Sequence, residues 1–197
     1  MYKKYIKRIF DIIISIFSII VLLPLFLVFS IIIKLIDGRV LYKQVRTGRS
    51  GKNFVIYKFC TMRNEEITRF GSFLRKFGLD ELPQLFNILK GDMSLIGPRP
   101  WITSYYKNMN NNQKRRVEVR PGLVGLAQLK GNNIDVFKKI DYDLEYIDSL
   151  SFVLDLKIII KTAIIIFGNK HTEIKDFEIK NEINELVKYK KNIKIVK

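Results

Sequence analysis

An uncharged apolar run over residues 12–33 constrains this chain most. It reads IIISIFSIIVLLPLFLVFSIII and is 22 residues long. At about 1.5 Å of rise per residue, a helix of this length reaches across a hydrocarbon core of about 30 Å. A helix in a soluble core would show a polar face, whereas the only polar side chains here are scattered around the helix, at Ser15, Ser18 and Ser30. The sequence therefore predicts a membrane helix.

Basic residues flank this run on both sides. They are Lys3, Lys4, Lys7 and Arg8 before it, and Lys34, Arg39, Lys43, Arg46 and Arg49 after it. The positive-inside bias then places both flanks in the cytoplasm. Pro24 removes a backbone donor and clashes with the carbonyl of Ile20, so we expect a bend there. A bent helix that enters and leaves by the same face fits both observations. A kinked spanning helix is the alternative, because membrane helices tolerate proline.

The charge balance narrows the classes of function. Lys and Arg number 35 against 19 Asp and Glu, which gives a formal net charge of +16. Such an excess usually reflects an anionic partner, such as nucleic acid, anionic lipid or a phosphorylated substrate. One Cys and one His exclude an internal disulfide and a zinc site with several such ligands. The segment GRSGK at 48–52 lacks the spacing of a Walker motif, which excludes a phosphate loop of that type.

The remaining pattern predicts an α+β, mostly helical fold. Two short strands at 40–45 and 54–59, separated by a Gly-rich turn, predict a β-hairpin. Apolar spacing predicts helices over 65–77, 80–90, 136–149 and 152–167. The last of these is strongly apolar but too short to span a membrane comfortably. We therefore expect it to lie in the headgroup plane or to pack beside the first segment.

Two adjacent acids, Asp80 and Glu81, are the candidate catalytic residues. They stand in the sequence LDELP, where Pro83 fixes the start of the predicted helix and so places both acids in its first turn. Neighbouring side chains on a helix point about 100° apart, so the two carboxylates would take different tasks. One could attack a phosphorus atom while the other binds Mg²⁺.

Two arginines in Pro-rich loops accompany the acids. Arg99 lies between two prolines and Arg120 precedes a third, and their planar guanidinium groups suit pyrophosphate oxygens. The alternative interpretation needs no function. In it Asp80 is an ordinary N-cap, Glu81 is stabilised by the helix dipole, and both arginines are surface charges in turns.

Five ordered blocks of the chain resemble the small monotopic phosphoglycosyl transferases of the bacterial sugar transferase family. The blocks are KRIFD (7–11), YKFCTM (57–62), LDELPQLFNILKGDMSLIGPRP (79–100), VRPGLVGLAQLKG (119–131) and FVLDLKIIIKT (152–162). The resemblance runs from about Lys4 to Gly168, so only the tail lies outside it.

The resemblance implies a reaction at the cytoplasmic face of the bacterial inner membrane. A phosphosugar would pass from a UDP-sugar to polyprenyl (undecaprenyl) phosphate with release of UMP, as the first step of membrane glycan assembly. The implied organisation is a re-entrant, monotopic membrane helix in 1–38, a cytoplasmic catalytic domain with amphipathic interfacial helices in 39–168, and a basic tail in 169–197. The implied partners are the UDP-sugar, polyprenyl phosphate and membrane lipid, but not nucleic acid.

Carried over residue by residue, the resemblance also implies roles in the site. Asp80 would be the nucleophile that forms a covalent phosphosugar intermediate, and Glu81 would assist with metal or proton handling. Mg²⁺ would be held by these two carboxylates. The implied substrate-binding residues are Arg99, Arg120, Lys58, Pro98 and Gln128.

A competing hypothesis is a non-catalytic, membrane-anchored basic module that binds anionic lipid or nucleic acid. A nucleic-acid module should gather Lys and Arg with exposed aromatic residues on one surface. In this chain the prolines and arginines instead surround an acidic pair, which would repel phosphate backbones.

Two departures from the family pattern affect these expectations. Cys60 stands where the family usually has a basic residue, so Lys58 or Arg63 would have to replace that charge. We interpret Cys60 as a partly buried apolar side chain and not as a nucleophile. Leu23, instead of the usual Ser, precedes Pro24, which weakens the signal for a bend.

Overall fold

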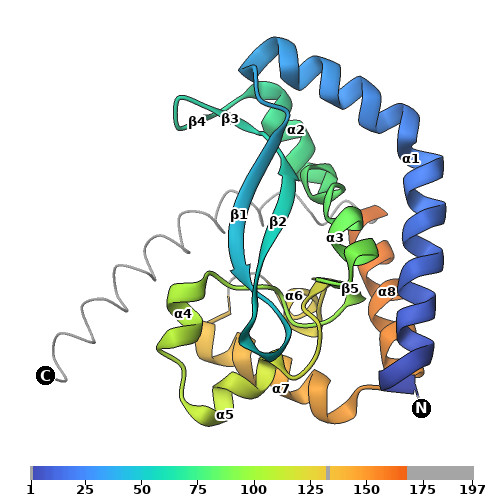
Figure 1. Ribbon diagram of the computed structural model, residues 1–197, viewed down its shortest axis with the longest axis vertical. Helices are drawn as coiled ribbons and strands as arrows, with labels where there is room; N and C mark the ends of the chain where they lie inside the picture. Colours follow the sequence, from blue (N-terminus) through green and yellow to red (C-terminus); the bar gives the residue numbers. More distant parts are fainter. Residues whose placement is uncertain (1, 132–133, 168–197) are drawn as a thin grey trace, which may run out of the picture.

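The computed structural model describes residues 2–131 and 134–167 and begins with a long apolar helix (Figure 1). A π-helical turn, Tyr2–Ile6, leads into α1, Lys7–Asp37, which ends at Gly38 in the left-handed conformation. Within the described ranges, α1 is the one helix long and apolar enough to cross a membrane. Its axis changes direction part-way, as expected for a helix that contains a proline, Pro24. The predicted bent apolar helix is thus confirmed.

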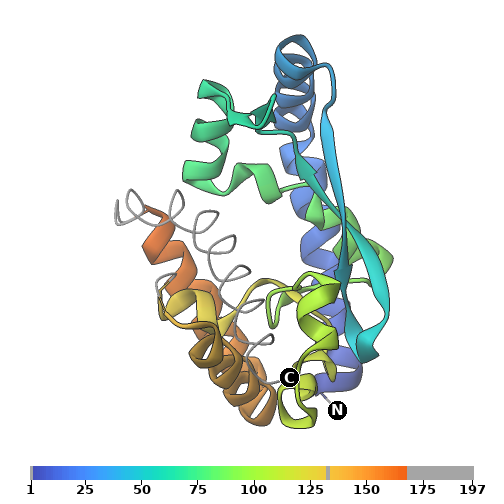
Figure 2. The same ribbon diagram turned by 90° about the vertical axis from the view of Figure 1, so that its left-hand side faces the viewer.

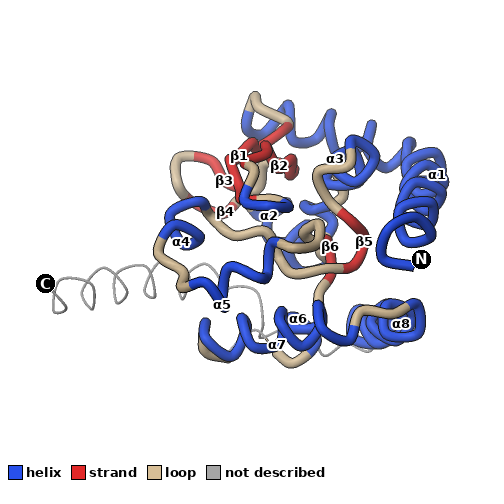
Figure 3. Tube along the Cα trace, turned by 60° about the horizontal axis from the view of Figure 1, so that its bottom comes forward, coloured by secondary structure: helices blue, strands red, loops and turns tan. Residues whose placement is uncertain are grey.

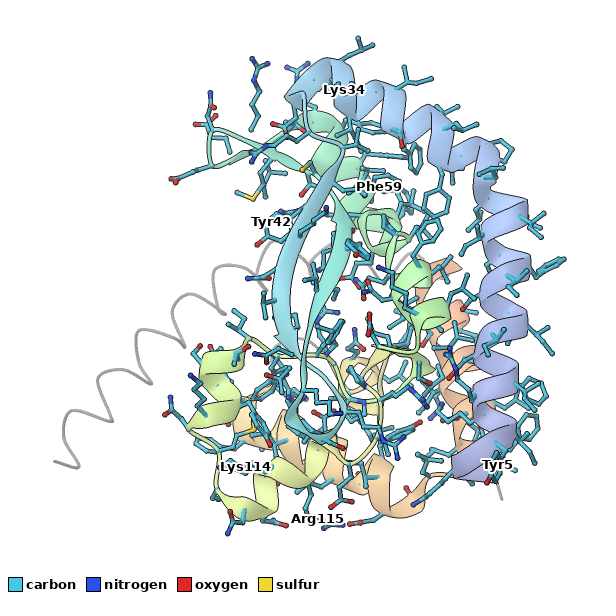
Figure 4. The ribbon with its side chains drawn as sticks, viewed as in Figure 1. Tyr5, Lys34, Tyr42, Phe59, Lys114 and Arg115 are labelled. Atoms are coloured by element: carbon cyan, nitrogen blue, oxygen red, sulfur yellow. The ribbon has the colours of Figure 1, made fainter. Side chains whose placement is uncertain are left out.

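An antiparallel hairpin follows α1, as predicted. Its elements are β1 (Leu41–Thr47), the 3₁₀ turn η2 (Arg49–Gly51) and β2 (Asn53–Phe59). Ile56 and Phe59 are both buried, but they point to opposite faces of β2 and pack into two different core clusters. Figure 4 shows Phe59 between the hairpin and α1, and its ring meets those of Phe26 and Phe29. The hairpin therefore rests on the second half of α1.

The helix predicted over 65–77 begins later than expected. Two short strands come first, and the elements are β3 (Met62–Arg63), β4 (Glu66–Ile67) and α2 (Arg69–Phe77). Glu65 lies in the turn between the strands at φ 67°. Thr68 is the N-cap of α2, because its hydroxyl accepts from the backbone N–H of Gly71 at 2.9 Å. Apolar spacing located the helix but did not reveal this cap.

The helix predicted over 80–90 is also shorter. A 3₁₀ turn, η3 (Leu79–Glu81), precedes α3 (Gln84–Lys90), and Pro83 occupies the N-cap position of α3. Proline lacks the N–H that an earlier start would require, so the regular helix begins after it. Gly91 ends α3 at φ 91°, as its position predicted. The prediction that Asp80 and Glu81 lie in the first turn of this helix was therefore wrong.

The second half of the chain forms a small parallel sheet and a second helical layer. Its elements are β5 (Ser94–Ile96), α4 (Thr103–Lys107), α5 (Asn111–Lys114), η4 (Arg115–Val117), β6 (Gly122–Val124), α6 (Leu126–Leu129), α7 (Val136–Ser149) and α8 (Phe152–Phe167). Figure 3 shows the parallel pair β5–β6 between the layer of α1 and α3 and the layer of α6 to α8. Helices α7 and α8 confirm the predictions for 136–149 and 152–167.

Polar contacts near its N-terminal end fix α1 to the rest of the protein. Asp11 is 3% exposed and accepts from Ser94 Oγ at 3.0 Å and from a backbone N–H of β5. Arg8 donates to the carbonyls of Ile88 at 2.6 Å and Leu89 at 2.9 Å, which lie in the last turn of α3. A cation at this end of a helix also suits the helix dipole. The apolar helix is thereby joined directly to α3.

Helix α8 approaches the same end of α1 (Figure 2). Asp155 on α8 is 5% exposed and pairs with Lys7 at 2.7 Å. The same carboxylate accepts from the hydroxyls of Tyr2 and Tyr146. Of the two arrangements expected for the 152–167 segment, packing beside the first segment is therefore present. Residues 169–197, predicted to be a basic tail, lie outside the described residues.

Candidate active site

Asp80 and Glu81 lie in η3, between α2 and α3. Gly78 adopts φ 71°, ends α2 and allows the chain to turn directly into η3. Asp80 is 8% exposed. The N-cap positions of η3 and α3 belong to Gly78 and Pro83, and neither helix has a side-chain capping hydrogen bond. The capping interpretation of Asp80 is therefore wrong, and a carboxylate is held in a largely buried turn for another reason.

Glu81 brings together two of the predicted substrate-binding residues. Its Oε1 accepts from Lys58 Nζ at 2.6 Å and from Arg99 Nη2 at 2.9 Å. The three side chains come from β2, η3 and the loop after β5, and each is partly shielded from water. Lys58, Arg99 and Glu81 together carry a formal charge of +1, and Asp80 is the next residue in the chain to Glu81. Such a cluster suits a substrate that brings phosphate oxygens.

Lys58 and Arg63, the two basic residues near Cys60, make different contacts. Lys58 is the one that reaches Glu81, whereas Arg63 donates to the carbonyl of Ile36 near the end of α1. Cys60 itself is partly buried against the core formed by α1, β2 and α2. Burial and the neighbouring Asp37 raise the pKa of the Cys60 thiol, which disfavours the nucleophilic thiolate. The interpretation of Cys60 as a partly buried apolar side chain is confirmed.

The loop from Pro98 to Trp101 presents Arg99 to Glu81. The carbonyl of Pro98 accepts from Gly122 N at 2.9 Å, and that of Trp101 accepts from Thr47 N at 3.0 Å. Gly122 is required here, because a Cβ on it would lie 2.1 Å from the backbone nitrogen of Gly97. Pro98 and Arg99 also line a shallow pocket at the surface. Its other lining residues are Thr47, Gly48, Arg116, Val117, Val119 and Pro121.

Arg120 makes its contact at the C-terminal end of α3, whereas Asp80 and Glu81 precede the N-terminal end. Its Nε donates to the carbonyl of Gly91 at 2.8 Å, beside the carbonyls that Arg8 holds. Burial, followed by the charges of Arg8 and Arg49, lowers the pKa of Arg120. Gln128, on α6, has a buried Oε1 that lacks a hydrogen-bond partner among residues 2–131 and 134–167. Thus Lys58, Arg99 and Glu81 converge, while Arg120 contacts a different part of the molecule.

A buried ion pair, Arg116–Asp143, adjoins the pocket and was not predicted from the sequence. Arg116 donates to Asp143 Oδ2 from Nη2 at 2.6 Å and from Nε at 3.1 Å. The only available signal was an acid inside the apolar stripe of α7, with Ile140 and Ile147 three residues before it and four after it. Its partner could not be read from the sequence.

The carboxylates present limit how a metal could be held. Within the described part of the chain there is no group of three or more His, Cys, Asp or Glu side chains that could hold a metal ion. Asp80 and Glu81, neighbours in the chain, can offer a metal at most a set of two carboxylates. This set fits Mg²⁺, because Mg²⁺ commonly uses one or two carboxylates and completes its shell with water and substrate phosphate oxygens.

Comparison with known proteins identifies the family. The model of the bacterial sugar transferase family matches residues 2–169. The chain belongs to this family. It is 42% identical over 171 residues to the uncharacterized sugar transferase EpsL of Bacillus subtilis, covering 80% of this chain and 85% of that protein. The predicted family, and with it the class of enzyme, is confirmed.

Two further relatives carry more specific names. The UDP-glucose:undecaprenyl-phosphate glucose-1-phosphate transferase of Xanthomonas campestris is 37% identical over 189 residues, covering 83% of this chain. The undecaprenyl-phosphate galactose phosphotransferase of Salmonella typhimurium is 33% identical over 191 residues, covering 82% of this chain. The matches span 39% and 40% of those two proteins, so this chain corresponds to only part of each.

Proposed function

We propose that this family member is a phosphoglycosyl transferase that moves a sugar 1-phosphate from a UDP-sugar to polyprenyl phosphate and releases UMP. The observation that carries the proposal is the largely buried Asp80 beside a carboxylate, Glu81, that is paired with Lys58 and Arg99. The names of the relatives support the substrate classes, since they specify UDP-glucose and undecaprenyl phosphate.

In the first step, Asp80 acts as the nucleophile. Its carboxylate oxygen attacks the phosphorus that bears the sugar, the bond from that phosphorus to the bridging oxygen breaks, and UMP leaves with that oxygen. Arg99 and Lys58 stabilise the charge that develops on the phosphate oxygens. Glu81 holds these two cations in place, because both ion pairs use its Oε1.

In the second step, a phosphate oxygen of polyprenyl phosphate attacks the same phosphorus. The bond to Asp80 breaks, the polyprenyl diphosphate sugar forms, and the Asp80 carboxylate is restored. Asp80 and Glu81 would hold Mg²⁺, which when bound supplies positive charge that neutralises the diphosphate.

We expect UMP release to require a UDP-sugar and Mg²⁺. The assay offers a panel of UDP-sugars to the protein in nanodiscs, with polyprenyl phosphate either present or omitted. A two-step mechanism predicts about one UMP per protein without the acceptor and continuous release with it. Chelation by EDTA should abolish release and added Mg²⁺ should restore it. Absence of UMP with every sugar would refute the proposed function, and release only when the acceptor is present would refute the two-step order.

We also propose that α1 is re-entrant, so that both of its ends lie on the cytoplasmic side. The bend in α1 and the basic residues at both ends support this arrangement. In it, the polar contacts of Arg8 and Asp11 with α3 and β5 would lie at the membrane boundary.

Single cysteines placed at the two ends of α1 test this topology. Tyr5→Cys and Arg39→Cys, each in a Cys60→Ser background, should both resist an impermeant maleimide in intact spheroplasts and react after permeabilisation. Both native side chains are exposed, so the described part of the protein covers neither site. A periplasmic single-cysteine membrane protein serves as the labelling control. Labelling of the two sites from opposite sides would show a spanning helix.

A further inference from the structure

Arg116 contacts the loop from Pro98 to Trp101, which carries Arg99, at two points. It is 5% exposed, and its Nη2 donates to the backbone carbonyl of Arg99 at 2.8 Å. Its guanidinium carbon lies 3.9 Å from the centre of the Trp101 ring, within range of a cation–π contact. Arg116 therefore touches the residues on both sides of Pro100, and these two contacts restrict the same short loop.

Asp143 on α7 fixes the orientation of Arg116. Its Oδ2 accepts from both Nε and Nη2, and the side chains of the two residues are 3% and 4% exposed. A buried guanidinium is costly without a charged partner, and Asp143 provides that partner. Because two nitrogens of the planar guanidinium donate to Asp143, the Arg116 side chain is held in one orientation. That orientation leaves Nη2 shared between Asp143 and the carbonyl of Arg99.

The loop that Arg116 holds is the one that delivers the Arg99 side chain to Glu81. Arg99 Nη2 lies 2.9 Å from Glu81 Oε1, whereas its own backbone carbonyl faces Arg116. We propose that the Arg116–Asp143 pair is a positioning device that sets Arg99 for its role at the substrate phosphates. This inference rests on the proposed function. Arg116 is a positioning residue in this scheme, because it acts through Arg99.

A double-mutant cycle between Arg116 and Arg99 tests the proposal. Removing a phosphate-binding donor typically costs about 100-fold in rate, so Arg99→Gln should lower kcat/KM for UMP release by about 100-fold. Misplacing that donor by about 1 Å has a similar effect, so Arg116→Gln should also cost about 100-fold. If Arg116 acts through Arg99, the double variant should lose little more than either single variant.

A merely structural role gives the opposite result. The losses would then multiply, to about 10,000-fold in the double variant, and that outcome would overturn the proposal. Parental activity of Arg116→Gln would overturn it as well. If Arg116→Gln does not fold, Arg116→Lys replaces it in the same cycle, because lysine keeps the charge beside Asp143 but loses the planar fork.

Arg115→Gln is the matched control. Arg115 is adjacent in η4, but it lies at the surface, where it pairs with Glu118 and Asp148 (Figure 4). We expect its kcat/KM to stay within about twofold of the parent, as for most exposed ion pairs. Failure of the proposed function would appear as a parent protein that releases no UMP. Failure of the positioning inference would appear as multiplying losses in a parent protein that is fully active.

Discussion

Asp80→Asn is expected to abolish turnover, with kcat for UMP release reduced by at least about 1,000-fold. The amide has nearly the same shape as the carboxylate but is neutral, so it cannot form the acyl phosphate by attack on the phosphorus. Because Asp80 lies in η3 and caps neither η3 nor α3, the substitution should leave the fold intact. The measurement is UMP release in nanodiscs with the preferred UDP-sugar, polyprenyl phosphate and Mg²⁺.

Mass spectrometry supplies the second measurement for Asp80. The parent protein, incubated with the UDP-sugar alone, should gain one sugar phosphate on the peptide that contains Asp80, and Asp80→Asn should gain none. Asp80→Ala excludes conversion of Asn back to Asp. Asp141→Asn is the matched control, since Asp141 is an exposed acid on α7. An adduct on a different residue, or parental turnover by Asp80→Asn, would contradict the assignment of the nucleophile.

Asp155→Asn is expected to destabilise the protein by about 3 kcal/mol, because it leaves the Lys7 ammonium without its buried partner. The Lys7 side chain is 12% exposed, so water replaces little of the lost interaction. The substitution also weakens the acceptor for the hydroxyls of Tyr2 and Tyr146. For a chain of this size, the expected fall in Tm is about 6–12 °C, measured by thermal unfolding in detergent.

Asp148→Asn provides the comparison for Asp155. Asp148 also pairs with a basic residue, Arg115, but its side chain is 57% exposed. Exposed ion pairs contribute about 0–1 kcal/mol, so this variant should lower Tm by only a few degrees. Equal falls in Tm for the two variants would mean that burial of the Lys7–Asp155 pair does not hold α8 against α1.

Local patterns in the sequence were sufficient to predict many of the helices and strands. The uncharged run over 12–33 predicted α1, and alternating apolar residues around a Gly-rich turn predicted the β1–β2 hairpin. Helical spacing predicted α7 and α8 with bounds close to those observed. These predictions succeeded because hydrophobic periodicity and turn residues act within a few positions of one another. The errors, at the starts of α2 and α3, came from caps and turns that periodicity does not report.

The family and its acidic pair were also recognisable from the sequence, but the partners of those acids were not. Only the tertiary structure decided that Lys58, and not Arg63, lies against Glu81, and that Arg120 contacts the far end of α3. It alone joined Arg116 to Asp143, 27 residues away, and Lys7 to Asp155, 148 residues away. Side-chain type and spacing determine which groups need a partner. The packing of β2, η3 and the β5–β6 loops determines which partner is within reach, because a charge pair of this kind requires contact within about 4 Å.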